Sequence, residues 1–171
     1  EDLVFPHHEN EIAQSEAANG VPFAKYWLHN AFLNIDNKKM SKSLGNFFTV
    51  REIGEKYDLQ VLRFFMLSAH YRSPLNFSAD LMEAAKSGLE RIVTAAENLQ
   101  RLSGSTAGEL SEAEKDLLNQ SHAYQEKFEA AMDDDFNTAD AVSAVFEYVK
   151  FCNTNVSGEN SKAYIDALYA K

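Results

Sequence analysis

The chain has 171 residues, 45% hydrophobic and 25% charged, which is typical of one or two folded domains and not of a disordered chain. Its formal net charge of -10 has the wrong sign for a protein that binds nucleic acid over its whole surface, so any RNA contact needs a local basic patch. There is no run of about 20 apolar residues that would span a bilayer, and the single cysteine, Cys152, excludes an internal disulfide and favours a reducing, cytoplasmic setting.

The first predicted helix covers residues 9 to 18, shortly after Pro6. His7 and Glu11 stand four residues apart, so a helix that starts nearby places both on one face, within reach of one metal ion. Imidazole and carboxylate groups both bind Zn²⁺. Two ligands do not make a tight zinc site, and a His/Glu pair taken alone is more often a contact at the start of a helix.

A short strand is predicted at residues 32 to 35, with a turn at Asp36-Asn37. The sequence Lys39-Met40-Ser41-Lys42-Ser43 follows this turn, and Gly45 closes the loop. Lysine ammonium groups act on phosphate oxygens as compact cations, and serine hydroxyls add further donors. Donors of this kind stabilise the negative charge that builds on a pyrophosphate leaving group. A basic loop is most often only a solvated turn, so the literal sequence KMSKS is what argues for a nucleotide site.

Two more helices are predicted before residue 77. A capping box from Thr49 to Glu52 opens a helix that runs to about Tyr57, and a very apolar helix covers residues 59 to 68. After it, the segment His70-Tyr71-Arg72 either contacts RNA or positions the KMSKS loop, and His70 can equally be a packed histidine at a helix end.

Residues 78 to 171 contain no proline and are predicted to form helices in series. The first begins at Ser78, ends at Ser103-Gly104-Ser105, and has apolar positions with helical spacing at Leu81, Ala85, Leu89, Ile92, Ala96, Leu99 and Leu102. The others begin at a capping box from Ser111 to Glu114, near Asn137-Thr138, and, for a shorter helix, at residue 161. Short links between helices favour an antiparallel bundle.

Two features of this second region could be mistaken for chemically active sites, and we expect neither to be one. The run Asp133-Asp134-Asp135 has the composition of a metal cluster, but consecutive side chains point in different directions, so a capping and solvated turn is expected. Cys152 ends an apolar helical stripe and is predicted to be a buried structural thiol.

Taken in order, these segments resemble the cysteinyl-tRNA synthetases, a family of class I aminoacyl-tRNA synthetases for which KMSKS is the signature loop. The resemblance covers essentially the whole chain. It is carried by residues 5–15 (FPHHENEIAQS), 26–29 (YWLH), 39–47 (KMSKSLGNF), 62–64 (LRF), 70–75 (HYRSPL) and 132–138 (MDDDFNT).

The resemblance implies a mainly α fold in two parts. Residues 1–77 are expected to be the C-terminal end of a Rossmann-like class I catalytic domain with a stem-contact segment. Residues 78–171 are expected to be an incomplete antiparallel helical bundle of the anticodon-binding type. The implied full-length protein is a cytoplasmic monomer without a membrane partner. It activates cysteine with ATP and Mg²⁺ to cysteinyl-adenylate and transfers the cysteine to tRNA(Cys).

The resemblance also implies roles for individual residues. His7 and Glu11 match two ligands of a zinc ion, one per full-length subunit, that binds the thiolate of the substrate cysteine; the other two ligands are cysteines that this sequence lacks. The loop from Lys39 through Met40, Ser41 and Lys42 to Ser43 matches the ATP-binding loop, with Lys39 and Lys42 as catalytic residues. Because the partner HIGH motif is also missing, we expect a piece of a longer enzyme that is inactive by itself.

Two alternative hypotheses stay open on the sequence. One is the cysteine ligase of mycothiol biosynthesis, a shorter relative that shares the zinc site and the KMSKS loop and differs in using an amino-sugar as acceptor. The other is a non-catalytic RNA-binding or interaction module derived from a synthetase, which the acidic second half of the chain disfavours.

Overall fold

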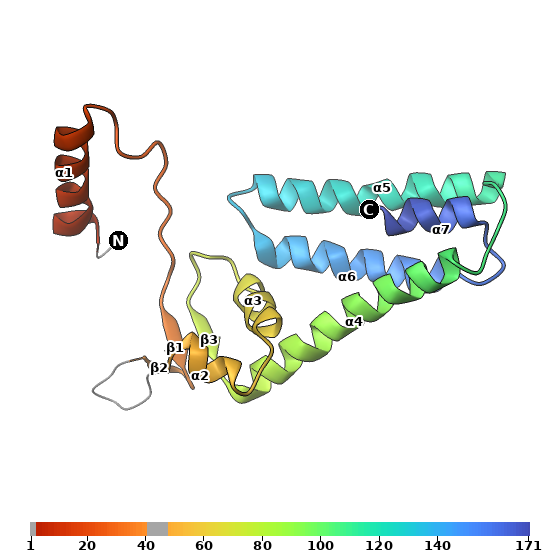
Figure 1. The fold of residues 1–171 in the computed structure, drawn as a ribbon, viewed down its shortest axis with the longest axis horizontal. Coiled ribbons are helices and arrows are strands. Elements are labelled where there is room, and N and C mark those ends of the chain that lie inside the picture. Colours follow the sequence, from red (N-terminus) through yellow and green to blue (C-terminus); the bar gives the residue numbers. More distant parts are fainter. Residues whose placement is uncertain (1–2, 41–47) are drawn as a thin grey trace.

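The computed structural model describes residues 3–40 and 48–171, which form a mainly helical protein (Figure 1). The first part contains a π-type turn η1 (Val4–His8), helix α1 (Glu9–Asn19), three short strands, and helices α2 (Val50–Gly54) and α3 (Leu59–Leu67). Four further helices follow: α4 (Ala79–Ser103), α5 (Glu112–Asp133), α6 (Thr138–Asn155) and α7 (Lys162–Tyr169). The mainly α class predicted from the sequence is confirmed.

Helix α1 stands apart from the remaining elements, to which an extended segment joins it (Figure 1). None of its residues is buried. The helix ends where Gly20 takes a left-handed conformation with φ 67°, which glycine adopts without the strain that a side chain brings. The predicted helix at residues 9 to 18 is therefore confirmed, with one more residue at its end.

A three-stranded sheet has the order β2-β1-β3. Strand β1 (Leu33–Ile35) pairs antiparallel with β2 (Lys38–Lys39) and parallel with β3 (Leu75–Phe77). The predicted turn is confirmed, since Asp36 and Asn37 both have positive φ, 47° and 61°, as tight hairpin turns require. Asn76 Oδ1 accepts a hydrogen bond from the Asn37 N–H at 2.7 Å, which ties this turn to β3.

Helix α2 begins with the predicted capping box, in which the Thr49 N–H donates to Glu52 Oε2 at 2.6 Å. The helix ends at Gly54 instead of near Tyr57. The chain must become extended at Asp58 (φ -60°, ψ 134°), whose carboxylate caps α3 by accepting from the Gln60 N–H. The Tyr57 N–H still donates to the Ile53 carbonyl at 2.9 Å, so a last helical turn follows Gly54 and reaches the predicted end.

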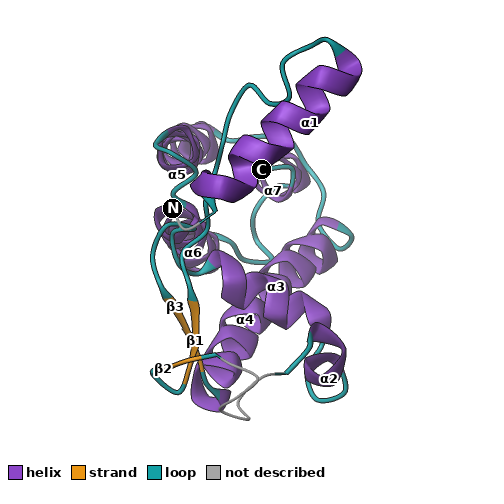
Figure 2. Cartoon of the chain, turned by 90° about the vertical axis from the view of Figure 1, so that its left-hand side faces the viewer, coloured by secondary structure: helices purple, strands orange, loops and turns teal. Residues whose placement is uncertain are grey.

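Helices α5 and α6 run antiparallel, with α7 beside them, and α4 crosses diagonally from the sheet to the far end of this group (Figure 1). Figure 2 shows the strands together at one edge of the molecule, near α3 and α4. Each predicted N-cap is present, because the side chains of Ser78, Ser111 and Asn137 accept hydrogen bonds from the first turn of α4, α5 and α6. Ser161, which was not predicted as a cap, does the same for α7.

Helix α4 links two hydrophobic cores. Its start contributes Met82 and Ala85 to a core shared with Val61 and Phe65 of α3. Its end contributes to a second core with α6 and α7, made of Leu99, Leu102, Phe151, Cys152, Tyr164, Ile165 and Leu168. The predicted burial of Cys152 is confirmed, and burial raises the pKa of its thiol.

Among the described residues, none of the helices combines the length and the apolar character that crossing a membrane requires.

Candidate functional site

Four side chains gather where η1 meets α1. His8 Nδ1 lies 2.8 Å from Glu11 Oε2, and the His8 ring lies 4.6 Å from the Trp27 ring and 5.0 Å from the His29 ring, centroid to centroid. The chain brings Trp27 and His29 back to His8 after α1, along the extended segment that leads to β1. The Nε2 atoms of His8 and His29 are buried and have no hydrogen-bond partner among the described residues. This cluster therefore presents two imidazole nitrogens without a partner among the described residues, each available to a water molecule or a ligand.

The structure pairs Glu11 with His8, three residues before it, and not with the predicted His7. The His7 side chain is exposed and takes part in no hydrogen bond or ion pair within the described part of the chain. Among the described residues, no group of three or more His, Cys, Asp or Glu side chains is placed so that it could hold a metal ion. His8, Trp27 and His29 were not named as site residues from the sequence, although residues 5–15 and 26–29, which contain them, both carry the family resemblance.

The KMSKS loop begins at the edge of the sheet. Lys39 is the last residue of β2 and pairs with Asn34 of β1. Its Nζ lies 5.9 Å from the centre of the Phe32 ring, a cation–π distance. Met40 follows and is half-buried. Three of the predicted ATP-binding residues, Ser41, Lys42 and Ser43, lie outside the described residues.

The chain after the loop is anchored to the same sheet. The Phe48 ring packs against the Phe77 ring of β3, with centroids 4.8 Å apart. Thr49 then caps α2. Strand β2 thus fixes one end of the segment and Phe48 fixes the other, so both ends of the basic loop are held on one small sheet.

Residues 69–72 contact the turn between α5 and α6. The Tyr71 hydroxyl donates to Asp135 Oδ1 at 2.7 Å, which raises the pKa of Tyr71. The Arg72 guanidinium forms an ion pair with Asp135 Oδ2, and His70 Nε2 lies 3.7 Å from the same oxygen. The sequence predicted a solvated turn at Asp133-Asp134-Asp135. Asp133 and Asp134 are indeed exposed, but Asp135 is half-buried and paired with Tyr71 and Arg72.

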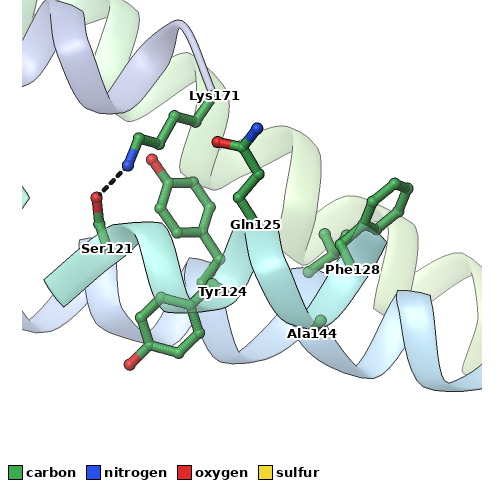
Figure 3. Close-up of a pocket in the computed structure, with 8 residues that line it drawn as sticks. Ser121, Tyr124, Gln125, Phe128, Ala144 and Lys171 are labelled. Carbon is green, nitrogen blue, oxygen red and sulfur yellow. Dashed lines mark hydrogen bonds between the residues drawn. The ribbon is translucent and has the colours of Figure 1, made fainter. Parts of the chain in front are cut away.

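A pocket of about 160 Å³ lies on the bundle, between α5, α6 and the last residue (Figure 3). Tyr124, Phe128, Ala144 and other side chains line it, and Lys171 Nζ donates to Ser121 Oγ at 2.6 Å beside it. The pocket belongs to helices at a distance from β2, so it does not contribute to the loop that begins at Lys39 (Figure 1).

Comparison with known proteins gives two matches to family models, and the similar relatives include two cysteine–tRNA ligases. The family of "tRNA synthetases class I (C) catalytic domain" matches residues 1–87, and the "DALR domain" matches residues 127–171. The chain is 68% identical over its whole length to a cysteine–tRNA ligase of Lachnospira eligens, and 61% identical over 98% of its length to one of Lachnoclostridium phytofermentans. It spans 36% and 37% of the lengths of these two relatives.

Proposed function

The chain belongs to the family of class I (C) tRNA synthetases, and from that premise we propose that it is part of a cysteine–tRNA ligase. The observation that carries the proposal is the 68% identity, over the whole chain, to a protein of that name. The domain division that goes with the proposal is the end of a catalytic domain over residues 1–77 and a helical bundle over residues 78–171. The DALR match within the bundle supports the second part.

The proposed reaction has two steps. The carboxylate of cysteine attacks the α-phosphorus of ATP, cysteinyl-adenylate forms, and pyrophosphate leaves. A terminal hydroxyl of tRNA(Cys) then attacks the activated carbonyl, and AMP leaves. Lys39 and Lys42 would act in the first step, because cationic groups beside the leaving pyrophosphate stabilise the charge that builds on it. The anchoring of both ends of the loop on the sheet supports this role.

Zinc is the proposed cofactor, with His7 and Glu11 as two of its ligands. The donor types fit, because imidazole nitrogen and carboxylate oxygen are both zinc ligands, and the bond to His8 uses only one oxygen of Glu11. When bound, zinc supplies a soft Lewis acid that prefers a thiolate to a hydroxyl and so favours cysteine over serine. His8 would orient the Glu11 carboxylate, as hydrogen-bonded neighbours of metal ligands commonly do. The remaining cysteine ligands would come from elsewhere in the longer protein.

The proposed partners are ATP with Mg²⁺, cysteine and tRNA(Cys), for a monomeric enzyme that acts in the cytoplasm. With a net charge of -10, the chain cannot attract RNA over its whole surface. The tRNA would therefore meet local basic residues, for which the exposed side chains of Arg51 and Arg63 are candidates.

Exchange of labelled pyrophosphate into ATP tests the activation step in the full-length protein that contains these residues. We expect exchange that depends on cysteine and is far weaker with serine. Lys42→Ala should lower kcat by about 10²–10³, the loss seen when one transition-state donor is removed. Lys38→Ala, at the start of β2 and outside KMSKS, is the matched control and should keep most of the activity. Absence of any cysteine-dependent exchange would favour a non-catalytic module.

A further inference from the structure

We propose that Asp135, in the turn between α5 and α6, is a positioning residue for the strand pair that carries Lys39. The proposal rests on the proposed function, because the role of Lys39 toward ATP is what gives the position of this strand pair a consequence. Asp135 would act through residues 69–72, which lie between the bundle and the sheet, and it would not touch the reacting groups itself.

The backbone of the turn that carries Asp135 is strained, and side-chain contacts with residues 69–72 offset this strain. Asp135 and Phe136 have positive φ values of 56° and 55°, which residues other than glycine rarely adopt and which surrounding structure must hold in place. The Asp135 carboxylate accepts the Tyr71 hydroxyl hydrogen bond and pairs with the Arg72 guanidinium. The Thr138 hydroxyl adds a bond to the Ala69 carbonyl at 3.3 Å. The turn therefore contacts residues 69–72 through three side-chain interactions.

The opposite side of the same segment holds the start of the sheet. The carbonyl oxygen of Tyr71 accepts a hydrogen bond at 2.8 Å from the N–H of Ala31, two residues before β1 begins. The Leu75 N–H then donates to the Phe32 carbonyl at 3.1 Å, where β3 begins to pair with β1. Tyr71 thus contacts the bundle through its hydroxyl and the sheet through its backbone.

The series of backbone contacts continues from β1 to β2, the strand from which the KMSKS loop begins. Strand β1 pairs with β2, so that Asn34 stands opposite Lys39. A shift of Tyr71 away from Asp135 would move Ala31 and β1, and with them the strand from which the KMSKS loop begins. The neighbouring Asp134 offers a comparison within the same turn, because its side chain is exposed and makes no hydrogen bond or ion pair in the described part of the chain.

Amide hydrogen exchange by NMR on the 171-residue chain tests the coupling without any enzymatic assay. The variants are Asp135→Ala, Tyr71→Phe, which removes only the hydroxyl, and Asp134→Asn as the matched control. The reporter amides are Ala31, bonded to the Tyr71 carbonyl, and Asp36, bonded to the Phe77 carbonyl. The Ile165 amide, bonded to the Ser161 carbonyl in α7, reports on the bundle.

We expect Ala31 and Asp36 to exchange roughly tenfold faster in Asp135→Ala and Tyr71→Phe, the effect of losing one hydrogen bond that has a charged acceptor. Ile165 should be unchanged, and Asp134→Asn should behave as the parent. Unchanged exchange at Ala31 and Asp36 would overturn the proposal. An equal acceleration at Ala31, Asp36 and Ile165 would also overturn it, because Asp135 would then only stabilise the bundle.

A second measurement separates this proposal from the proposed function. In the full-length protein, Asp135→Ala should lower kcat for cysteine-dependent pyrophosphate exchange by roughly tenfold, with the KM for cysteine unchanged, while Asp134→Asn keeps the parental kcat. If the parent protein shows no exchange activity, the proposed function fails and the hydrogen-exchange result still decides the role of Asp135. If the parent is active and Asp135→Ala matches it, the Asp135 proposal alone fails.

Discussion

Glu114 shows how a single buried carboxylate joins two helices that are distant in sequence. Its side chain accepts hydrogen bonds from the backbone N–H and the hydroxyl of Ser111, and from the backbone N–H and the hydroxyl of Ser161. Ser111 caps α5 and Ser161 caps α7, so the negative charge lies at the start of both helices, where their dipoles favour it. The first half of this arrangement was predicted as a capping box. The second half was not, because Ser161 stands 47 residues further along the chain.

Replacing Glu114 by glutamine should destabilise the protein by about 1–3 kcal/mol. The glutamine amide has the same shape but directs an NH₂ group at backbone and hydroxyl donors, which leaves some of them without an acceptor. Urea unfolding followed by circular dichroism measures the change. Glu112→Gln is the matched control, since Glu112 is exposed and, among the described residues, pairs only with Lys115. It should change stability by less than about 0.5 kcal/mol. Equal stability of the two variants would contradict this role of Glu114.

Glu114 should also make the folding stability depend on pH. Burial alone would raise its pKa, but the hydrogen bonds from Ser111 and Ser161 outweigh that effect and lower it from 4.5 to about 2. A lowered pKa in the folded state stabilises the protein above pH 4.5, and this stabilisation is lost as pH falls from about 4.5 toward 2. The difference in urea midpoint between the parent and Glu114→Gln should therefore be constant from pH 7 to pH 5 and shrink below pH 4.5. A constant difference down to pH 2.5 would contradict the assignment.

At the scale of elements, α4 shows the limit of a prediction made from periodicity alone. The predicted apolar face includes Leu81 and Ala96, which are exposed, whereas Met82 and Ala95, one residue away in each case, are buried. The helix meets α3 at its start and α6 and α7 at its end, so the buried stripe follows two different neighbours. Helix starts were predicted well, because capping side chains act within one turn. Which face each helix buries depends on partners that sequence spacing does not identify.

Helix α7 and His8 also show that the pattern of one segment does not identify the partners against which it packs. The sequence indicates only a short helix from residue 161, yet Tyr164, Ile165 and Leu168 are among the most completely buried side chains. A short helix gains its stability from packing, which the pattern of one segment does not reveal. The candidate site was predicted from spacing along one helix. The contact of His8 with Trp27 and His29 depends on the return of the chain after α1, and no spacing rule contains it.

A substitution at Gly88 tests how tightly the helices cross. A side chain at this position of α4 would place its Cβ 3.2 Å from Phe64 Cε1 in α3 and 3.3 Å from Phe146 Cζ in α6. Gly88→Leu should therefore force both rings apart and destabilise the protein by about 1–3 kcal/mol, the usual effect of overpacking. Ser87→Leu, at the neighbouring exposed position, controls for the change in residue type and should be nearly neutral. Thermal unfolding distinguishes the two variants. Equal melting temperatures would show that α3 and α6 can move to accommodate the larger side chain without a loss of stability.

At the scale of the whole molecule, the described residues form a small sheet and a helical bundle that share α4. The first core extends into the start of α4, and the class I catalytic-domain match likewise ends within this helix, at residue 87. The sheet anchors both ends of the KMSKS loop, and the bundle reaches the sheet through Asp135 and residues 69–72. These contacts form the route by which we propose that Asp135 affects the position of the strand pair before the KMSKS loop.

The most direct test of the central claim is the transfer of labelled cysteine by the full-length protein that contains this chain, supplied with ATP and unfractionated tRNA. We predict that cysteine becomes linked to tRNA(Cys), and that Lys42→Ala greatly slows the transfer. An amino-sugar acceptor offered in place of tRNA should receive no cysteine. Transfer to the amino-sugar and not to tRNA would contradict the assignment and identify the mycothiol-type ligase, and binding of tRNA without any transfer would identify a non-catalytic module.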